Sequence, residues 1–554
     1  MLASIIVILI AIIPAMVISY KAFRCSTASD KNNSDEFYTG SGELTEKQFC
    51  DTSLAYAYQV AAISLFTFYG AQYGFWTILI PIFWGCGYFL LRHIVKRGAV
   101  KNFIEQNGSE TIHGLLGGHY NKFKWIAPIA GLTSVLGLSG TAFFEAEYTA
   151  GSITRTLTLS QNTSLSAITL LLFVLFVACT LTYIIAGGEK AVVKTDHWQL
   201  KGAYLGFMLF LGGIIGILFY RGYQWTPWII SGASVFLQVI LIRLLKGGNL
   251  TSGTKSEYKN ILIGGLTIFL LGIGLGYWSK FDLNIHTSIR ELSWSDFTQT
   301  HQICSPLVLG LSLISLFVSN VCWQLVDVSN WQRISSMRKA EKFEQSLSDS
   351  LKFLGLFSPI SWTFAIFLGM GIKLILPTTL SSEMPLIDLL SSMANSENII
   401  LMILSFGMML SLVFIMFSTL DSLIIGISFT AHKDIMPGMS RKMSSIKTGT
   451  LLITSGLFIL YVLARNCIKE VDDILYTFYA FQLGLVPSIL YALFSKKDKA
   501  HPQAALWSII FGILTPISIL FLFQASPVIW SPASTVIVSS IVFFIVHYAT
   551  KKYN

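Results

Sequence analysis

Five consecutive residues, Ser418-Thr419-Leu420-Asp421-Ser422, place hydroxyls and a carboxylate inside an apolar stretch at about 398–429. On a helix, Ser418, Asp421 and Ser422 lie at i, i+3 and i+4 and share one face. Such side chains are costly at bilayer depth unless they bind something there. Hard oxygen ligands with one negative charge suit a small cation such as sodium. The cluster therefore predicts a cation site inside a membrane-spanning helix.

Other polar residues interrupt apolar runs elsewhere. Gln59 lies in a polar helix that begins near Asp51, and a broken helix of this kind lines a cavity in many transporters. Asp196 follows the run GGEKAVVKT, where it either starts a helix or faces that cavity. Glu145 and Glu147 either reach the outer surface, attract a cationic solute or carry protons. The residue types alone leave these alternatives open.

Aromatic and amide side chains gather in two further apolar runs. Walls of this composition suit a site for a small polar solute, although each side chain also fits packing or a membrane interface. The candidate solute-binding residues are Gln59, Asn320, Trp323, Gln324, Tyr479 and Gln482.

The composition is that of a membrane protein. Of the 554 residues, 53% are hydrophobic and 12% are charged, whereas soluble domains average about 25% charged residues. Backbone groups in lipid are satisfied only in helices or closed barrels, and these apolar runs are too long for barrel strands. We therefore predict an all-α polytopic membrane protein. About fifteen spans are expected, at residues 2–20, 52–70, 74–92, 125–148, 165–186, 197–220, 227–245, 260–278, 303–326, 352–377, 399–430, 448–465, 474–495, 504–524 and 529–549.

Basic residues predict the orientation. If the N-terminus lies outside and the spans alternate, most loop lysines and arginines fall on the inside, where such residues are enriched. The few that fall outside are Arg155, Arg221, Lys280, Arg290, Lys373, Arg465 and Lys469. We expect an integral protein of the plasma (inner) membrane with its N-terminus outside and its C-terminus in the cytoplasm. The formal net charge of +9 then reflects topology, and the lipid bilayer rather than nucleic acid is the expected partner.

Motifs of enzymes are missing from the sequence. It contains no GxSxG, HExxH or P-loop pattern. Its seven cysteines are scattered without metal-binding spacing. We therefore expect a transporter and no enzyme, with no cofactor.

Three blocks resemble the sodium:solute symporter family, which includes sodium/glucose, sodium/proline and sialic acid transporters. Residues 187–199, GGEKAVVKTDHWQ, are similar to the family's GG-x-x-AV-x-x-TD-x-x-Q block. Residues 418–422, followed by TAHKDI at 430–435, resemble its S-S/T-x-x-S helix. Residues 327–333, DVSNWQR, are similar to its Q-R signature, closest to the urea-transporter branch. The resemblance implies a leucine-transporter-type inverted repeat of five plus five helices, with extra helices.

The resemblance also implies sodium ligands. For the first sodium these are the carbonyls of Ala57, Val60 and Ile415 and the hydroxyls of Ser418 and Thr419. A second sodium, found in some members, implies Asp196, Ser418, Asp421 and Ser422. Sodium is then the coupling ion.

The resemblance spans roughly residues 36–495, which we predict to be the transporter core. An extra N-terminal helix at 1–24 precedes it and a two-helix extension at 496–554 follows. An inserted helix pair at about 227–278 departs from the family pattern, which has a loop there. An even insertion preserves the orientation of everything that follows.

The combined expectation is sodium-coupled symport of a small polar solute by alternating access around a midplane site. The residues leave two alternatives open. One is proton coupling through Asp421, Asp196 or Glu145. The other is a transporter-like sensor or scaffold that signals through partners. The sequence does not identify the solute, the ion stoichiometry or the oligomeric state.

Overall fold

The computed structural model describes residues 34–107, 110–120, 123–157, 164–223, 225–247, 252–280, 306–376, 384–437, 443–465, 471–495, 501–522 and 527–553, together with Ile13, Val17 and Tyr20. Most of the predicted helix at 2–20, and of the 1–24 unit, therefore lies outside the described residues. Every secondary-structure element among the described residues is a helix.

The helices of the first half are α2 (Ser34–Thr39), α3 (Glu46–Ala57), α4 (Val60–Tyr73), α5 (Leu79–Lys96), α6 (Ala99–Asn107), α7 (Ile112–His119), α8 (Ile126–Leu157), α9 (Ser164–Tyr220), α10 (Thr226–Gly247) and α11 (Ser252–Trp278). Those of the second half are α13 (Pro306–Val326), α14 (Val328–Ser336), α15 (Phe343–Ile375), α16 (Pro385–Ala394), α17 (Ile399–Thr430), α18 (Met443–Arg465), α19 (Val471–Leu483), α20 (Val486–Phe494), α21 (Pro502–Ile517) and α22 (Pro527–Tyr553).

Twelve segments of the described chain are long and apolar enough to cross a membrane. The segment Val60–Lys96 combines two of the predicted spans, as does Ala167–Tyr220. The N-terminal predicted span is outside the described residues, so the twelve segments account for the others. The predicted all-α polytopic architecture is confirmed.

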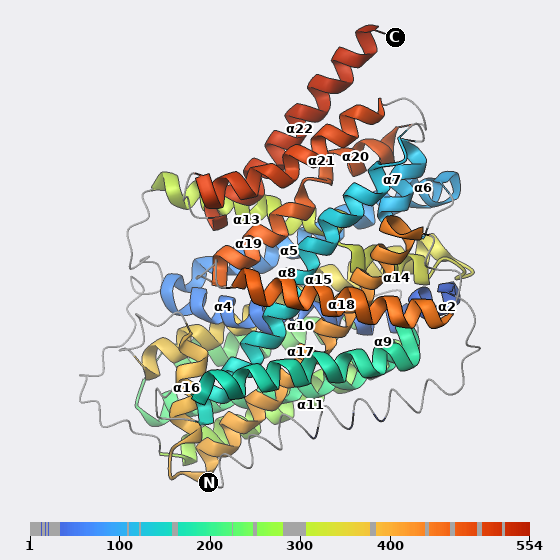
Figure 1. Ribbon diagram of the computed structural model, residues 1–554. Coiled ribbons are helices and arrows are strands. Elements are labelled where there is room, and N and C mark those ends of the chain that lie inside the picture. The colour runs from blue at the N-terminus through green and yellow to red at the C-terminus, as the bar shows by residue number, and fades with distance from the viewer. Residues whose placement is uncertain are drawn as a thin grey trace.

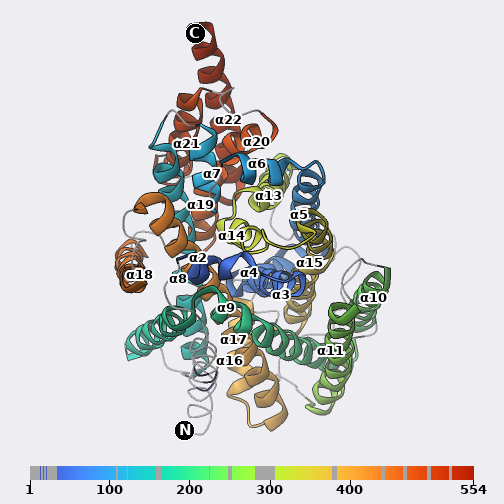
Figure 2. The same cartoon turned by 90° about the vertical axis from the view of Figure 1, so that its right-hand side faces the viewer.

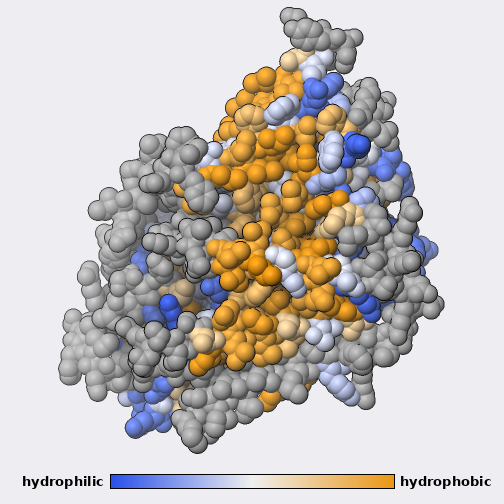
Figure 3. Space-filling model, viewed as in Figure 1, coloured by the Kyte–Doolittle hydropathy of each residue, from blue (hydrophilic) through white to orange (hydrophobic). Residues whose placement is uncertain are grey.

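The outer surface carries the apolar side chains that a bilayer requires. A broad apolar band crosses the face seen in Figure 3. Large side chains such as Trp228, Phe236 and Leu270 remain more than half exposed on the peripheral helices α10 and α11. Exposure on this scale is unfavourable in water and neutral in lipid. The protein is therefore an integral membrane protein.

The first core helix is broken at Tyr58 and Gln59. Upstream, α3 begins with a capping box in which Thr45 and Gln48 satisfy each other's backbone N–H groups. Gln59 then leaves helical geometry, with φ −33° and ψ 133°, before α4 begins at Val60. The break leaves backbone groups of both half-helices without helical partners. A broken helix, as predicted around Gln59, is confirmed.

Two predicted spans, 165–186 and 197–220, form the arms of one bent helix, α9. The bend lies at Gly188, with φ 56° and ψ −147°, a region that favours glycine. A Cβ at this position would overlap the Phe37 carbonyl. Figure 2 shows the two arms diverging from the bend. The GGEKAVVKTD block thus supplies the bend and the first turns of the second arm, which carries Asp196.

The helix pair α10 and α11, predicted to be an insertion, contacts the rest of the described chain mainly through α9. Helices α9 and α11 approach closely along facing glycines. A Cβ at Gly212 would overlap the Phe269 carbonyl, and one at Gly276 would overlap the Gly213 carbonyl. Small residues that let two backbones touch are a common device of membrane helix packing. At the other end of the chain, α22 packs with α21, α13 and α19 and projects beyond the body in Figure 1.

Candidate functional site

The polar residues of α17 are completely enclosed. Ser418, Thr419, Asp421 and Ser422 each expose 2% or less of their surface. Helix α17 packs against α3, α4, α8 and α9, so its polar face meets both halves of the broken helix and the bent helix. The face predicted from the i, i+3, i+4 spacing is therefore an interior face, surrounded by other helices.

Asp196 joins three helices at this face. Its carboxylate accepts a hydrogen bond from Ser418 Oγ of α17 at 2.6 Å and another from Thr52 Oγ1 of α3. Asp421, one turn further along α17, accepts a hydrogen bond from Tyr183 Oη at 2.6 Å. The two carboxylates also interact electrostatically. The structure thus brings together the residues predicted for the second sodium site.

A buried arginine completes the group. Arg333 of α14 donates from Nη2 to Ser422 Oγ at 2.8 Å and from Nε to Thr52 Oγ1 at 3.3 Å. Its Cζ lies 4.8 Å from the centre of the Tyr56 ring, within the range of a cation–π interaction. We call the set around these contacts the central cluster. Its members are Thr52, Tyr56, Tyr183, Asp196, Arg333, Ser418, Thr419, Asp421 and Ser422.

The sequence prediction missed several of these contacts. Thr52 and Tyr183 were not singled out, and Arg333 was noted only as part of a motif. Arg333 did carry a signal, because a cation close to an apolar run is rarely left without a carboxylate nearby. For Thr52 and Tyr183 no local signal exists, since hydroxyls are common on packed membrane helices.

Some buried polar atoms of the central cluster have no hydrogen-bond partner among the described residues. They are Thr419 Oγ1, Asp421 Oδ1 and Arg333 Nη1. Buried polar atoms are almost always partnered by protein, water or a bound ion. The Thr419 hydroxyl and the Asp421 carboxylate are each ligands that a small hard cation accepts. Because they are two residues apart on α17, they lie on different sides of the helix and belong to different candidate sites.

The residues predicted for the first sodium site lie on both sides of the helix break and on α17. Ala57 and Val60 flank the break, and Ile415, Ser418 and Thr419 follow one another along α17; all are buried. The Ala57 carbonyl accepts a hydrogen bond from Trp362 Nε1 at 2.8 Å. A carbonyl oxygen has two lone pairs, so this bond leaves one for a cation. The Ser418 hydroxyl, as described above, donates to Asp196.

A small pocket lies beside the break. Four of the six predicted solute-binding residues line it: Gln59, Asn320, Trp323 and Tyr479. Tyr479 Oη donates to Gln59 Oε1 at 2.7 Å, and the Tyr479 and Trp323 rings lie 4.3 Å apart. The remaining lining residues are Ala62, Leu65, Phe66, Trp84, Ser319 and Trp362.

The other two predicted solute-binding residues lie outside this lining. Gln324 accepts a hydrogen bond from Asn330 Nδ2 at 2.5 Å, and its amide thus supports the turn into α14. Gln482 is fully buried and its side chain lies close to Gly137 of α8. Both were predicted because aromatic and amide side chains gather in these apolar runs, and such a pattern does not distinguish a face toward a pocket from a face toward a neighbouring helix.

Glu145 is buried rather than at the outer surface. Its two carboxylate oxygens accept hydrogen bonds from the backbone N–H groups of Val60, at 2.7 Å, and Ala61, at 3.1 Å. These are the first residues of α4. Glu147, two residues later, is partly buried and accepts a hydrogen bond from Tyr461 Oη at 2.7 Å. The two glutamates therefore have different roles.

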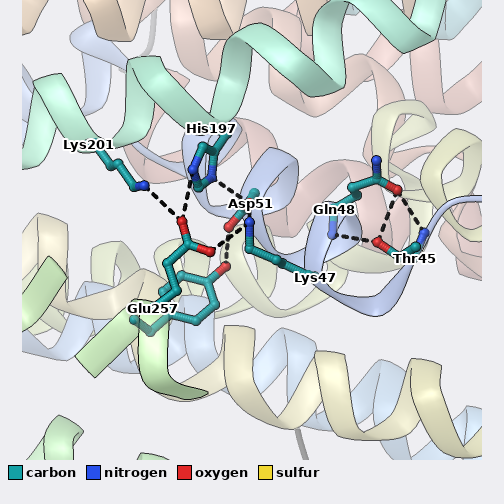
Figure 4. A network of polar contacts seen from close by, with 8 residues as sticks. Thr45, Lys47, Gln48, Asp51, His197, Lys201 and Glu257 are labelled. Atoms are coloured by element: carbon teal, nitrogen blue, oxygen red, sulfur yellow. Dashed lines mark hydrogen bonds and ion pairs between the residues drawn. The ribbon is translucent and has the colours of Figure 1, made fainter. Parts of the chain in front are cut away.

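A second group of charged side chains lies next to the central cluster (Figure 4). Asp51 accepts hydrogen bonds from His197 Nδ1 at 2.8 Å and Tyr258 Oη at 2.6 Å. Glu257 of α11 contacts Lys47, His197 and Lys201 at 2.8 to 2.9 Å. Burial lowers the pKa of Lys47, but its hydrogen bonds and charge interactions with Glu257 and Asp51 outweigh this and raise it. We call these six residues the Glu257 network.

Comparison with known proteins identifies the fold. No protein-family model matches the chain, and no curated protein matches it in sequence. Its structure is similar to that of a Na+-coupled sialic acid symporter solved in a substrate-bound, outward-open state with a novel Na+ site. The match covers 99% of this chain and 98% of that chain, with a TM-score of 0.61 and 13% sequence identity. The chain therefore has the fold of a sodium-coupled symporter, and the predicted leucine-transporter-type architecture is confirmed.

Proposed function

We propose that this protein is a sodium-coupled symporter of a small polar solute, functionally related to the sodium:solute symporter family. The observation that carries the proposal is that two oxygens of the central cluster, Thr419 Oγ1 and Asp421 Oδ1, are buried without a hydrogen-bond partner among the described residues. They lie in a buried cluster that packs against both halves of a broken helix. Transporters of this architecture coordinate sodium with half-helix ends and inward-facing hydroxyls at the centre of the bundle.

The charges of the central cluster support a cation. Arg333 interacts electrostatically with Asp196, Asp327 and Glu189, all of them buried. Asp421 interacts with Asp196, so the region holds four buried carboxyl groups and one buried arginine. Burial disfavours the charged form of a carboxyl group unless a cation lies beside it, so a cation that enters this region would stabilise carboxylates that Arg333 alone does not neutralise. The first sodium takes Ala57, Val60, Ile415, Ser418 and Thr419, and Asp196, Asp421 and Ser422 form the second candidate site.

Trp362 connects the ion and solute sites. Its ring lines the pocket, and its Nε1 donates to the carbonyl of Ala57 at the break. A solute in the pocket therefore contacts Trp362, and a sodium at the break contacts the Ala57 carbonyl to which Trp362 is hydrogen-bonded. The parts of the protein that hold the solute and the sodium must then move together. Sodium affinity for one conformation then biases the equilibrium that also loads the solute. The inward membrane potential contributes about 2.3 kcal/mol per 100 mV for each charge moved.

Proton coupling is the second candidate, favoured by the same unpartnered Asp421 oxygen. A protonated Asp421 has no need of a metal ion. Sodium coupling and proton coupling are distinguished by reconstituting the purified protein into proteoliposomes and measuring the uptake of a panel of solutes. An inward sodium gradient, an inward proton gradient and a potassium control are compared. Sodium coupling predicts uptake only with sodium; uptake with the proton gradient alone would replace sodium by a proton.

The proposed orientation places the N-terminus outside and the C-terminus in the cytoplasm. It predicts that the segment 246–259, where α10 ends and α11 begins and which carries Lys246, Lys255 and Lys259, is cytoplasmic and that the segment 279–302 is outside. Labelling of single engineered cysteines in intact cells with a membrane-impermeant reagent measures this. A labelled 246–259 segment would show that one flanking helix does not cross the membrane.

A further inference from the structure

Glu145 acts as a cap for a helix to which it does not belong. Helix α4 has 14 residues, and its own N-cap residue, Gln59, makes no side-chain capping hydrogen bond. The carboxylate of Glu145, from α8, accepts the N–H groups of Val60 and Ala61 instead. Both oxygens are used, and the side chain is completely buried. The carboxyl group therefore faces the positive end of the half-helix.

The capped turn also forms part of the pocket wall. Gln59 and Ala62, on either side of the two capped residues, both line the pocket. The start of a half-helix beside a solute pocket is the natural place for the carboxylate of a solute, because its free N–H groups and dipole favour an anion. Here the position already holds the protein's own carboxylate. A solute carboxylate would find both donors taken.

The rest of the pocket offers no countercharge. Among the described residues that line it, there is no lysine, arginine, histidine, aspartate or glutamate. It contains instead an aromatic wall, in which the Trp362 ring lies 4.5 Å from both Phe66 and Trp84. The polar groups are those of Gln59, Ser319, Asn320 and Tyr479. Flat apolar faces with a few amide and hydroxyl groups match an uncharged molecule that has an apolar face and hydrogen-bonding edges.

We propose that the transported solute is uncharged and that Glu145 excludes carboxylates by occupying the anion position at the start of α4. This rests on the proposed function, because it assigns a class of solute to the same pocket. An uncharged solute would distinguish this chain from the sialic acid symporter that the chain resembles in fold, because the solute of that symporter is an acid.

The test removes the Glu145 carboxylate and supplies a free anion that can take its place. In purified E145A, the Val60 and Ala61 N–H groups lose their acceptor, so sodium formate should bind there. We expect formate to raise the melting temperature of E145A by roughly 2 °C or more relative to sodium chloride, and to leave the wild type unchanged. E147A is the matched control, because Glu147 lies on the same helix but accepts from Tyr461. A formate response in E147A or the wild type, or none in E145A, would overturn the assignment of Glu145.

Two further measurements complete the test. E145S removes the carboxylate and leaves a short polar side chain, and it serves if E145A does not fold. There, acetate should quench tryptophan fluorescence at a concentration at least tenfold lower than in the wild type; equal concentrations would contradict the proposal. In wild-type proteoliposomes, a hexose should compete with solute uptake better than the corresponding hexuronate or hexosamine. Preference for either charged sugar would overturn the uncharged class.

These arms distinguish the two proposals. The formate and acetate measurements use purified protein and do not depend on transport. If they succeed while no solute enters with a sodium gradient, the role of Glu145 stands and sodium-coupled symport fails. If sodium-coupled uptake is found but the anion measurements fail, symport stands and Glu145 has only a structural role.

Discussion

The central cluster and the Glu257 network use neighbouring residues on the same two helices, α3 and α9. On α3, Asp51 belongs to the network and Thr52 to the central cluster; on α9, Asp196 belongs to the cluster and His197 to the network. In the network, every carboxylate oxygen of Asp51 and Glu257 has a donor. In the central cluster, buried oxygens are left without one.

The difference separates a structural group from a binding group. In the Glu257 network, every carboxylate oxygen already has a donor, so none is free to bind an ion. Such a network contributes modestly to stability, because several members are partly exposed: Lys47, His197, Lys201 and Glu257. A buried group with missing partners is unfavourable until something supplies them. Changes in the cluster should therefore alter ion binding, and changes in the network should alter only how α11 is attached.

The largest effect is expected from the paired carboxylates. D196N and D421N should each reduce sodium-driven uptake by roughly 100-fold, because each removes a charge from a buried site. If one cation needs both carboxylates, the double variant should be little worse than either single variant. Uptake by reconstituted, monodisperse protein measures this. Independent losses that multiply in the double variant would mean that the two carboxylates do not share an ion.

The second largest effect is expected at the contact between α11 and α9. G276A adds a Cβ that overlaps the backbone of Gly213, so it should lower stability by about 1–3 kcal/mol. G274A, on the same helix, meets nothing within 4 Å and should be neutral or slightly stabilising. Thermal unfolding of the purified variants measures the difference. Equal melting temperatures would show that α11 does not pack on α9 through these glycines.

The smallest effect is expected from the Glu257 network. E257Q weakens three partly exposed ion pairs, so stability should fall by about 1 kcal/mol or less. The sodium concentration that gives half-maximal uptake should stay within about twofold of the wild type. A larger change in sodium dependence would contradict the proposed distinction between the central cluster and the Glu257 network.

The sequence predicted the elements of the fold well because lipid restricts the choices. A backbone in a bilayer has to form a helix, so each long apolar run could be identified without knowledge of its neighbours. The break at Gln59 and the polar face of α17 followed from polar residues in apolar surroundings. The bend of α9 was expected as two separate spans, because a polar block with two glycines reads as a loop unless the angle at Gly188 is known.

The partners within the site were harder to predict. Thr52 reaches Asp196 across 144 positions of sequence, and Glu145 reaches Val60 across 85. Such contacts depend on how the helices cross, which no local pattern specifies. The alternatives considered for Glu145 assumed that a carboxylate near a helix end faces solvent or a ligand. They did not include the exposed N–H groups of a broken helix as its partner.

The most direct test of the account is equilibrium binding of radioactive sodium to the purified protein, which requires no knowledge of the solute. The wild type should show saturable binding that sodium displaces and potassium does not. T419A should raise the half-saturating sodium concentration about tenfold, because it removes one ligand oxygen. T182A, an exposed threonine that donates to its own helix, should not change it. Identical binding curves for T419A and the wild type would contradict a sodium site at this face of α17.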